Sequence, residues 1–265
     1  MFWLFWYSEA MISWRPTIFL AIVAGIRKGE VQKMQKYEII TDQNDEHYGH
    51  IKALTDFGDV KKGDIGGKID NYDNLSQEGD CWVCRNAQVR GNAKVYGNAE
   101  VSGNAKVYEN AEVYDNARVF GEAKVYGEAK VYGKAKAYDN AWVGGDTKVY
   151  DNAEVYDNVW VYDSTKVYGN AEVYGYARVY GDAKVYDYAK VYDFAKVYDN
   201  ACVREDAKVY GDAEVYDNAW VYGKARVYDY AEVYEDAEVY GNAKVYDDYE
   251  VYGDARVNGD AEEWS

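Results

Sequence analysis

The segment Ala93-Lys94-Val95-Tyr96-Gly97-Asn98, followed at once by Ala99-Glu100-Val101, is a typical unit of a repeat that specifies the fold. Every sixth residue from Val83 to Val257 is valine, and Ala137 is the one exception. The residue before each Val-Tyr pair varies, and the residue before that one is mostly alanine. A period of six that never slips cannot follow the 3.6-residue period of a helix, so the chain is predicted to be all-β.

Each six-residue unit reads as one short strand and one corner. The pattern Ala-x-Val-Tyr alternates buried and exposed positions, which is typical of a strand with one buried face. The next two residues are mostly Gly, Asp or Asn, which favour tight turns and left-handed backbone. So short a strand cannot bury its face alone, and stacking coils bury it instead. We therefore predict a single-stranded, triangular β-helix of about ten 18-residue coils, roughly 48 Å long at the strand spacing of a sheet.

The segment Val95-Tyr96-Gly97-Asn98-Ala99-Glu100 resembles the repeat of the hexapeptide-repeat, left-handed β-helix family. That resemblance implies the left hand of the helix, whereas the period alone would permit either hand. Residues 53–67, leading into residues 74–83, resemble the leader of the YdcK-type hexapeptide-repeat proteins of bacteria, phages and prophages.

Three regions follow from these patterns. Residues 81–265 form the repeat region, and residues 34–80 form a small N-terminal cap with strands around residues 37–40 and 51–54. Residues 1–33 form an apolar leader interrupted by Glu9, Arg15 and Pro16. We interpret this leader as lying upstream of a natural start at Met34. A signal or membrane anchor, and a helix packed on the rod, are the other two interpretations.

The net charge limits the classes of binding partner, and the cysteine content indicates the cellular location. The net charge of −17 argues against direct nucleic-acid binding and against attachment to an anionic membrane. A membrane contact would require residues 1–33 to belong to the native protein. With only three cysteines and no disulfide framework, we expect a bacterial cytoplasmic location, or export if residues 1–33 act as a signal.

Residues 18 apart stack on one face, so the surface is predicted to carry columns of like side chains. One column is lysine, one is an unbroken tyrosine ladder, and a third holds two tryptophans. Tyr176 and Phe194 add an aromatic pair at a corner. The candidate partner-binding residues are Trp142, Trp160, Tyr138, Tyr156, Tyr174, Tyr192, Tyr210, Lys130, Lys148, Lys166 and Lys184.

Two interpretations of the tyrosine ladders remain open at this point. Stacked aromatic residues on neighbouring strands stabilise a sheet, and repeat duplication would copy them whatever their use. Alternatively, the aromatic surface binds a partner, because tyrosine offers a large contact area at a low entropy cost.

Enzymatic activity is not expected. Resemblance to hexapeptide-repeat acyltransferases would imply a catalytic histidine beside an expelled loop and an acyl-coenzyme A donor. The only histidines, His47 and His50, precede the repeats, and no insertion interrupts the register. Cys81 and Cys84 fall on opposite faces of a strand, so they form no metal site. We predict no catalytic, cofactor-binding or metal-binding residues.

The favoured hypothesis is a non-catalytic scaffold that presents its Tyr, Lys and Glu ladders to an unidentified protein partner. A glycan partner and a homo-oligomer formed through the exposed strand edges are further candidates. One alternative is a phage or prophage anti-defence protein that imitates DNA, although its net charge is sparser than the ~1.7 Å spacing of charges in duplex DNA. Another is an acyltransferase-like protein that lacks the usual histidine.

Overall fold

The computed structural model describes residues 35–42 and 45–258, excluding the side chains of residues 42–48. The chain separates into two compact units, Met1–Met34 and Gln35–Ser265. The predictions for residues 1–33 therefore lie outside the described residues. The described residues contain β-strands and no helix, as predicted.

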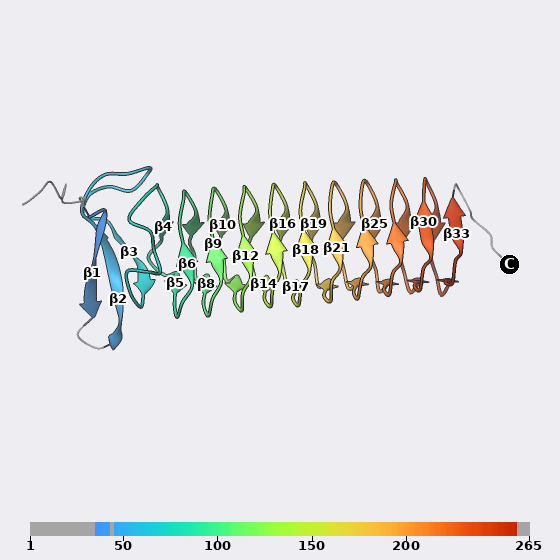
Figure 1. The fold of residues 1–265 in the computed structure, drawn as a ribbon, viewed down its shortest axis with the longest axis horizontal. Helices are drawn as coiled ribbons and strands as arrows, with labels where there is room; N and C mark the ends of the chain where they lie inside the picture. Colours follow the sequence, from blue (N-terminus) through green and yellow to red (C-terminus); the bar gives the residue numbers. More distant parts are fainter. Residues whose placement is uncertain (1–34, 43–44, 259–265) are drawn as a thin grey trace, which may run out of the picture. The chain divides into compact units, whose positions relative to one another are not determined.

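Three sheets run along the unit that begins at Gln35, and Figure 1 shows them as successive coils from β4 to β33. Sheet 1 consists, in spatial order, of β1 (Tyr37–Asp42), β2 (Asp45–Ala53), β3 (Ile65–Ile69), β5 (Gln88–Val89), β8 (Lys106–Val107), β11 (Lys124–Val125), β14 (Trp142–Val143), β17 (Trp160–Val161), β20 (Arg178–Val179), β23 (Lys196–Val197), β26 (Glu214–Val215), β29 (Glu232–Val233) and β32 (Glu250–Val251).

Sheets 2 and 3 contain ten strands each. Sheet 2 consists of β6 (Lys94–Val95), β9 (Glu112–Val113), β12 (Lys130–Val131), β15 (Lys148–Val149), β18 (Lys166–Val167), β21 (Lys184–Val185), β24 (Cys202–Val203), β27 (Trp220–Val221), β30 (Glu238–Tyr240) and β33 (Arg256–Asn258). Sheet 3 consists of β4 (Trp82–Val83), β7 (Glu100–Val101), β10 (Arg118–Val119), β13 (Lys136–Ala137), β16 (Glu154–Val155), β19 (Glu172–Val173), β22 (Lys190–Val191), β25 (Lys208–Val209), β28 (Arg226–Val227) and β31 (Lys244–Val245).

Consecutive repeat strands lie in different sheets, and each pairs in parallel with the strand one coil further on. Val143 of β14, for example, lies opposite Val161 of β17. The prediction of a triangular β-helix with 18-residue coils is confirmed. Most repeat strands span two residues rather than four, but the inter-coil hydrogen bonds extend further: the N–H of Tyr96 donates to the carbonyl of Val113 at 3.1 Å, and the carbonyl of Ala111 accepts from the N–H of Lys94 at 2.9 Å.

The core is built from the alanine and valine positions. These side chains are fully buried from Val83 to Ala243. Thr147 and Thr165 occupy alanine positions and are also buried, and the hydroxyl of Thr165 donates to the carbonyl of Tyr162 at 2.8 Å. The repeat therefore accepts a threonine in its core because a backbone acceptor lies within reach.

The corners adopt left-handed backbone at the residue that follows the tyrosine position. Glycine adopts this conformation freely, but half of these corners carry Asp or Glu, such as Asp151 with φ 60°. The Asp151 carboxylate accepts a hydrogen bond from the backbone N–H of Gly169, one coil further on, at 3.3 Å. Eight other acidic corner side chains make the same bond, which offsets the cost of the strained backbone.

The N-terminal cap also supplies a coil of its own. Strand β3 pairs in parallel with β5, so Ile69 lies beside Val89, and Leu75 forms an isolated parallel bridge with Val95. Both of these cap residues, Ile69 and Leu75, are fully buried. Sheet 1 consequently has eleven parallel strands, from β3 to β32, against the ten coils predicted.

A hairpin covers this first coil, with β1 antiparallel to β2 and β2 antiparallel to β3. Lys36 is buried beneath it, and its ammonium group donates to the carbonyl of Cys81 at 2.9 Å and lies 4.6 Å from the Phe57 ring centroid. Burial lowers the pKa of Lys36. The side chain of Asn74 is buried as well, and it bonds four backbone groups of the cap and the first repeats.

Candidate functional site

The predicted binding residues lie on three different sheets. Trp142 and Trp160 begin strands of sheet 1, and the four lysines from Lys130 to Lys184 begin strands of sheet 2. The tyrosine ladder from Tyr138 to Tyr210 follows the strands of sheet 3. Because each sheet faces a different direction, these sets form three separate surfaces, and no flat partner can contact all of them at once.

The tyrosine ladder of sheet 3 is a regular stack. The rings of Tyr138 and Tyr156 lie 4.8 Å apart at 4°, and those of Tyr192 and Tyr210 lie 4.9 Å apart at 2°. The hydroxyl of Tyr138 donates to Glu154 in the next coil at 3.0 Å. Such stacking stabilises neighbouring strands by about 0.2–1 kcal/mol per pair, so the ladder has a structural use before any partner is considered.

The lysine column of sheet 2 is exposed. Lys130 pairs with Glu112 at 3.2 Å, whereas Lys148, Lys166 and Lys184 make no ion pair with any described residue. Exposed ammonium groups at this spacing are screened by water and salt, so they are tolerated without a partner.

Sheet 1 carries a stack of aromatic and cationic side chains. The indoles of Trp142 and Trp160 lie 5.1 Å apart and are nearly parallel at 3°. The Lys124 ammonium lies 3.9 Å from the Trp142 ring centroid, and the Arg178 guanidinium lies 5.9 Å from that of Trp160. The two tryptophans are thus held between two cations that favour the faces of their π-systems.

The tyrosine ladder of sheet 1 is interrupted beside this stack by Gly144. A Cβ atom at Gly144 would lie 2.3 Å from Cζ of Tyr126, so the ring of Tyr126 occupies the space of the missing side chain. In that position it meets Trp142 edge-on, with ring centroids 6.3 Å apart at 88°. The glycine therefore allows an aromatic cluster to form around Trp142.

A second aromatic pair lies at the edge of sheet 1. Tyr176 and Phe194 stack at 5.1 Å, and each leaves more than half of its side chain exposed, at 55% and 56%. Tyr176 precedes Arg178 by two residues, and Arg178 lies opposite Trp160, which is 46% exposed. We call Trp142, Trp160, Tyr176, Arg178 and Phe194 the aromatic patch.

The sequence pattern predicts the Trp142–Trp160 and Tyr176–Phe194 pairs separately. It does not predict that they belong to one surface, and it assigns no role to Arg178. The signal was available, because residues 176 and 194 replace the usual Asn or Asp of a corner, two positions before the column of Trp160. Trp220, which begins β27 of sheet 2, was also missed.

In the described part of the chain, the remaining candidates for reactive or metal-binding side chains are His50 and the three cysteines. His50, in β2, is half-buried with Nδ1 2.9 Å from the carbonyl oxygen of Gly66. The three cysteines are free; Cys81 is buried at an alanine position, and burial raises the pKa of the Cys84 thiol to about 11. Within residues 35–42 and 45–258 no group of His, Cys, Asp and Glu could hold a metal ion. The same ranges contain no helix long and apolar enough to cross a membrane.

Comparison with known proteins adds no relative: no protein-family model matches the chain, and a search of curated proteins finds no significant match.

Proposed function

We propose that the protein is a non-catalytic β-solenoid scaffold that binds a protein partner through the aromatic patch of sheet 1. The observation that carries this proposal is that an exposed Trp160 lies opposite Arg178, and that Tyr176, two residues before Arg178, stacks on Phe194. Trp, Tyr and Arg are the residues that contribute most to protein interfaces. Exposed aromatic area of this kind marks interaction sites.

The geometry of the patch also favours binding. Stacking holds both indoles in place, so they lose little side-chain entropy when a partner covers them. Lys124 and Arg178 at the ends of the stack can pair with carboxylates at the rim of an interface. The rest of the rod serves as a rigid support that holds the patch.

The acidic side chains support this proposal over DNA mimicry. Nine corner carboxylates, including Asp151 and Glu235, accept hydrogen bonds from backbone N–H groups of the next coil. Others are paired with cations, such as Glu154 with Lys136 at 2.7 Å. Much of the negative charge thus has a use within the fold, which a charge-based imitation of DNA does not require.

Affinity capture from a bacterial lysate, using the full chain as bait at low and high salt, tests the proposal. We expect a partner that is retained at high salt, because aromatic burial resists screening. The double variant Trp160→Ala/Tyr176→Ala should lose this partner, and Tyr156→Ala on sheet 3 is the matched control that should keep it. A partner released by salt from the wild type and captured equally by the double variant would contradict the proposal.

A further inference from the structure

The regular pattern of sheet 2 breaks at one coil. Lys184 lies opposite Cys202 where the lysine column would continue, and Arg204 replaces the tyrosine that would stack between Tyr186 and Tyr222. The break removes one tyrosine from the stack and leaves Nε of Arg204 buried without a hydrogen-bond partner, while the Arg204 guanidinium pairs with Glu205 at 2.9 Å and lies 4.6 Å from the Tyr222 ring centroid. Costly departures from a repeat are the places where function is to be sought.

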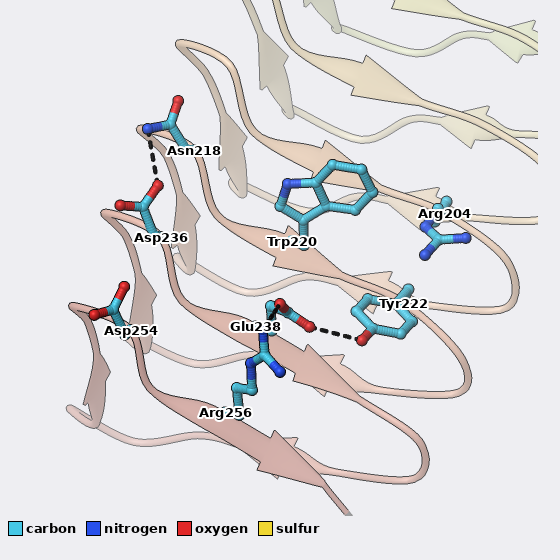
Figure 2. A pocket seen from close by; sticks show the side chains of 8 residues that line it. All are labelled: Arg204, Asn218, Trp220, Tyr222, Asp236, Glu238, Asp254 and Arg256. Carbon is cyan, nitrogen blue, oxygen red and sulfur yellow. Dashed lines mark hydrogen bonds and ion pairs between the residues drawn. The ribbon is translucent and has the colours of Figure 1, made fainter.

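The break leaves room for Trp220, which lies opposite Cys202 in the next coil. Cys202 is only 4% exposed although it occupies an outward position, whereas Trp220 is 42% exposed. In Figure 2 the indole is seen nearly face-on, with Arg204 next to it; the Arg204 guanidinium lies 5.3 Å from the ring centroid. The coil therefore presents a flat aromatic face to solvent.

Hydrogen-bonding groups flank this face on both sides, around a groove of about 480 Å³. Figure 2 shows Asn218, Asp236 and Asp254 in a column on one side, with Arg204 and Tyr222 on the other. Asn218 donates to Asp236 at 3.1 Å, and the Asp254 carboxylate has no hydrogen-bond partner among the described residues. We call this site the Trp220 groove.

The polar groups at the far end of the groove contact one another. Arg256 pairs with Glu238 at 3.0 Å, and Glu238 accepts a hydrogen bond from the hydroxyl of Tyr222 at 2.8 Å. Trp220, Glu238 and Arg256 follow one another in three successive coils. They extend over about 10 Å at the strand spacing of a sheet, which suits a short oligosaccharide.

We propose that the Trp220 groove binds a neutral saccharide. The apolar C–H face of a pyranose ring would lie on the exposed indole, and its hydroxyl groups would donate to Asp236 and Asp254. This combination of one flat apolar surface with a few placed polar groups is what small-ligand sites require. The site lies on sheet 2, so it does not depend on the aromatic patch of sheet 1.

Charge selects a neutral ligand over the two charged classes. An anionic ligand would approach a protein of net charge −17 and meet the carboxylates of Asp236, Asp254 and Glu238. A cationic peptide would approach an indole whose ring centroid lies 5.3 Å from the Arg204 guanidinium, and like charges would repel. A saccharide avoids both repulsions.

The test uses the full chain and a panel of immobilised neutral oligosaccharides of glucose, galactose, mannose, rhamnose and N-acetylglucosamine, with oligolysine as the cationic probe. We expect binding to at least one saccharide, weakened tenfold or more in Trp220→Ala, as for the loss of about 1.4 kcal/mol. Tyr230→Ala removes an aromatic side chain that is 65% exposed and does not line the groove, so this variant should bind as the wild type does.

The double variant Cys202→Lys/Arg204→Tyr distinguishes loss of the binding site from loss of the fold. It restores the regular lysine and tyrosine columns, so we expect a higher melting temperature together with loss of saccharide binding, since the new lysine would compete with Trp220 for its place. The proposal is overturned if no saccharide of the panel binds, if binding survives Trp220→Ala, or if oligolysine binds more tightly than every saccharide.

Discussion

The first coil of the solenoid and its last described strands differ in how their apolar core is covered. At the N-terminal end the first coil is covered by the β1–β2 hairpin, and Ile69 and Leu75 are fully buried. At the other end Val251 and Val257 are 9% and 7% exposed, and no described strand pairs with the outer edges of β31, β32 and β33. A coil depends on its neighbours for its stability, so its position along the rod decides what each contact contributes.

Raising the pH should reduce the stability of the fold more than any substitution below, because it acts on the tyrosines of every coil. It should therefore destabilise both ends of the solenoid alike. Burial and the neighbouring tyrosines raise the pKa of Tyr150 and Tyr180 to about 12, above their ordinary value of 10.0. The folded state therefore holds these protons more tightly than the unfolded chain, and its stability is complete below pH 10 and falls as the pH rises towards 12.

Circular dichroism and tyrosinate absorbance, recorded together from pH 8 to pH 13, check this prediction. The ladder tyrosines should ionise as the β-sheet signal disappears. Ionisation of most tyrosines near pH 10 with an intact β-sheet signal would contradict it.

The substitution Asn74→Ala should destabilise the capped end strongly. The Asn74 side chain accepts from the N–H groups of Asp70 and Asn71 and donates to the carbonyls of Gly91 and Ala93. Since these groups would lose their partners in a buried site, we expect a loss of about 3–5 kcal/mol in the free energy of unfolding. Asn92→Ala, which removes an exposed corner amide bonded to Asn110 at 3.0 Å, is the control in denaturant titrations and should change little.

A pair of core substitutions compares the middle of the rod with its last described strand. Val167→Ala removes a fully buried side chain between two coils, and we expect a loss of about 2 kcal/mol. Val257→Ala lies in the last described strand, which pairs on one side only, and should cost about half as much or less. Hydrogen exchange should show faster opening in β33 than in β18 already in the wild type, and equal costs of the two variants would argue against the comparison.

Surface ion pairs should have the smallest effect. Lys136 and Glu154 lie 2.7 Å apart, but both side chains are partly exposed, so Lys136→Ala should cost less than about 1 kcal/mol. Arg256→Ala, in the last described strand, breaks the pair with Glu238, and since the Arg256 side chain is 70% exposed we expect no measurable change. Thermal unfolding at low and high salt measures both, and only the first variant should show a salt-dependent difference from the wild type.

The candidate sites were predicted less completely than the fold. The Trp142–Trp160 stack follows from the 18-residue spacing, and its parallel pairing is found as expected. The role of Gly144 could not be predicted, because it depends on Tyr126 leaning along the rod axis into the space of the missing ring. Cys202 and Arg204 are visible in the sequence as irregular letters, but the exposure of the Trp220 face depends on how three coils pack.

The repeat fold follows from the sequence, since the valine and alanine positions specify which side chains are buried and the corner residues specify where the chain turns. This information is local and recurs in every coil, so a period of six is sufficient to predict it. The tertiary structure alone decided the extra coil formed by Ile69 and Leu75, because the step from Leu75 to Val83 departs from the period. The tertiary structure also places aromatic and charged side chains beside one another. These contacts join residues from different coils, so they depend on how the columns and corners pack on each sheet.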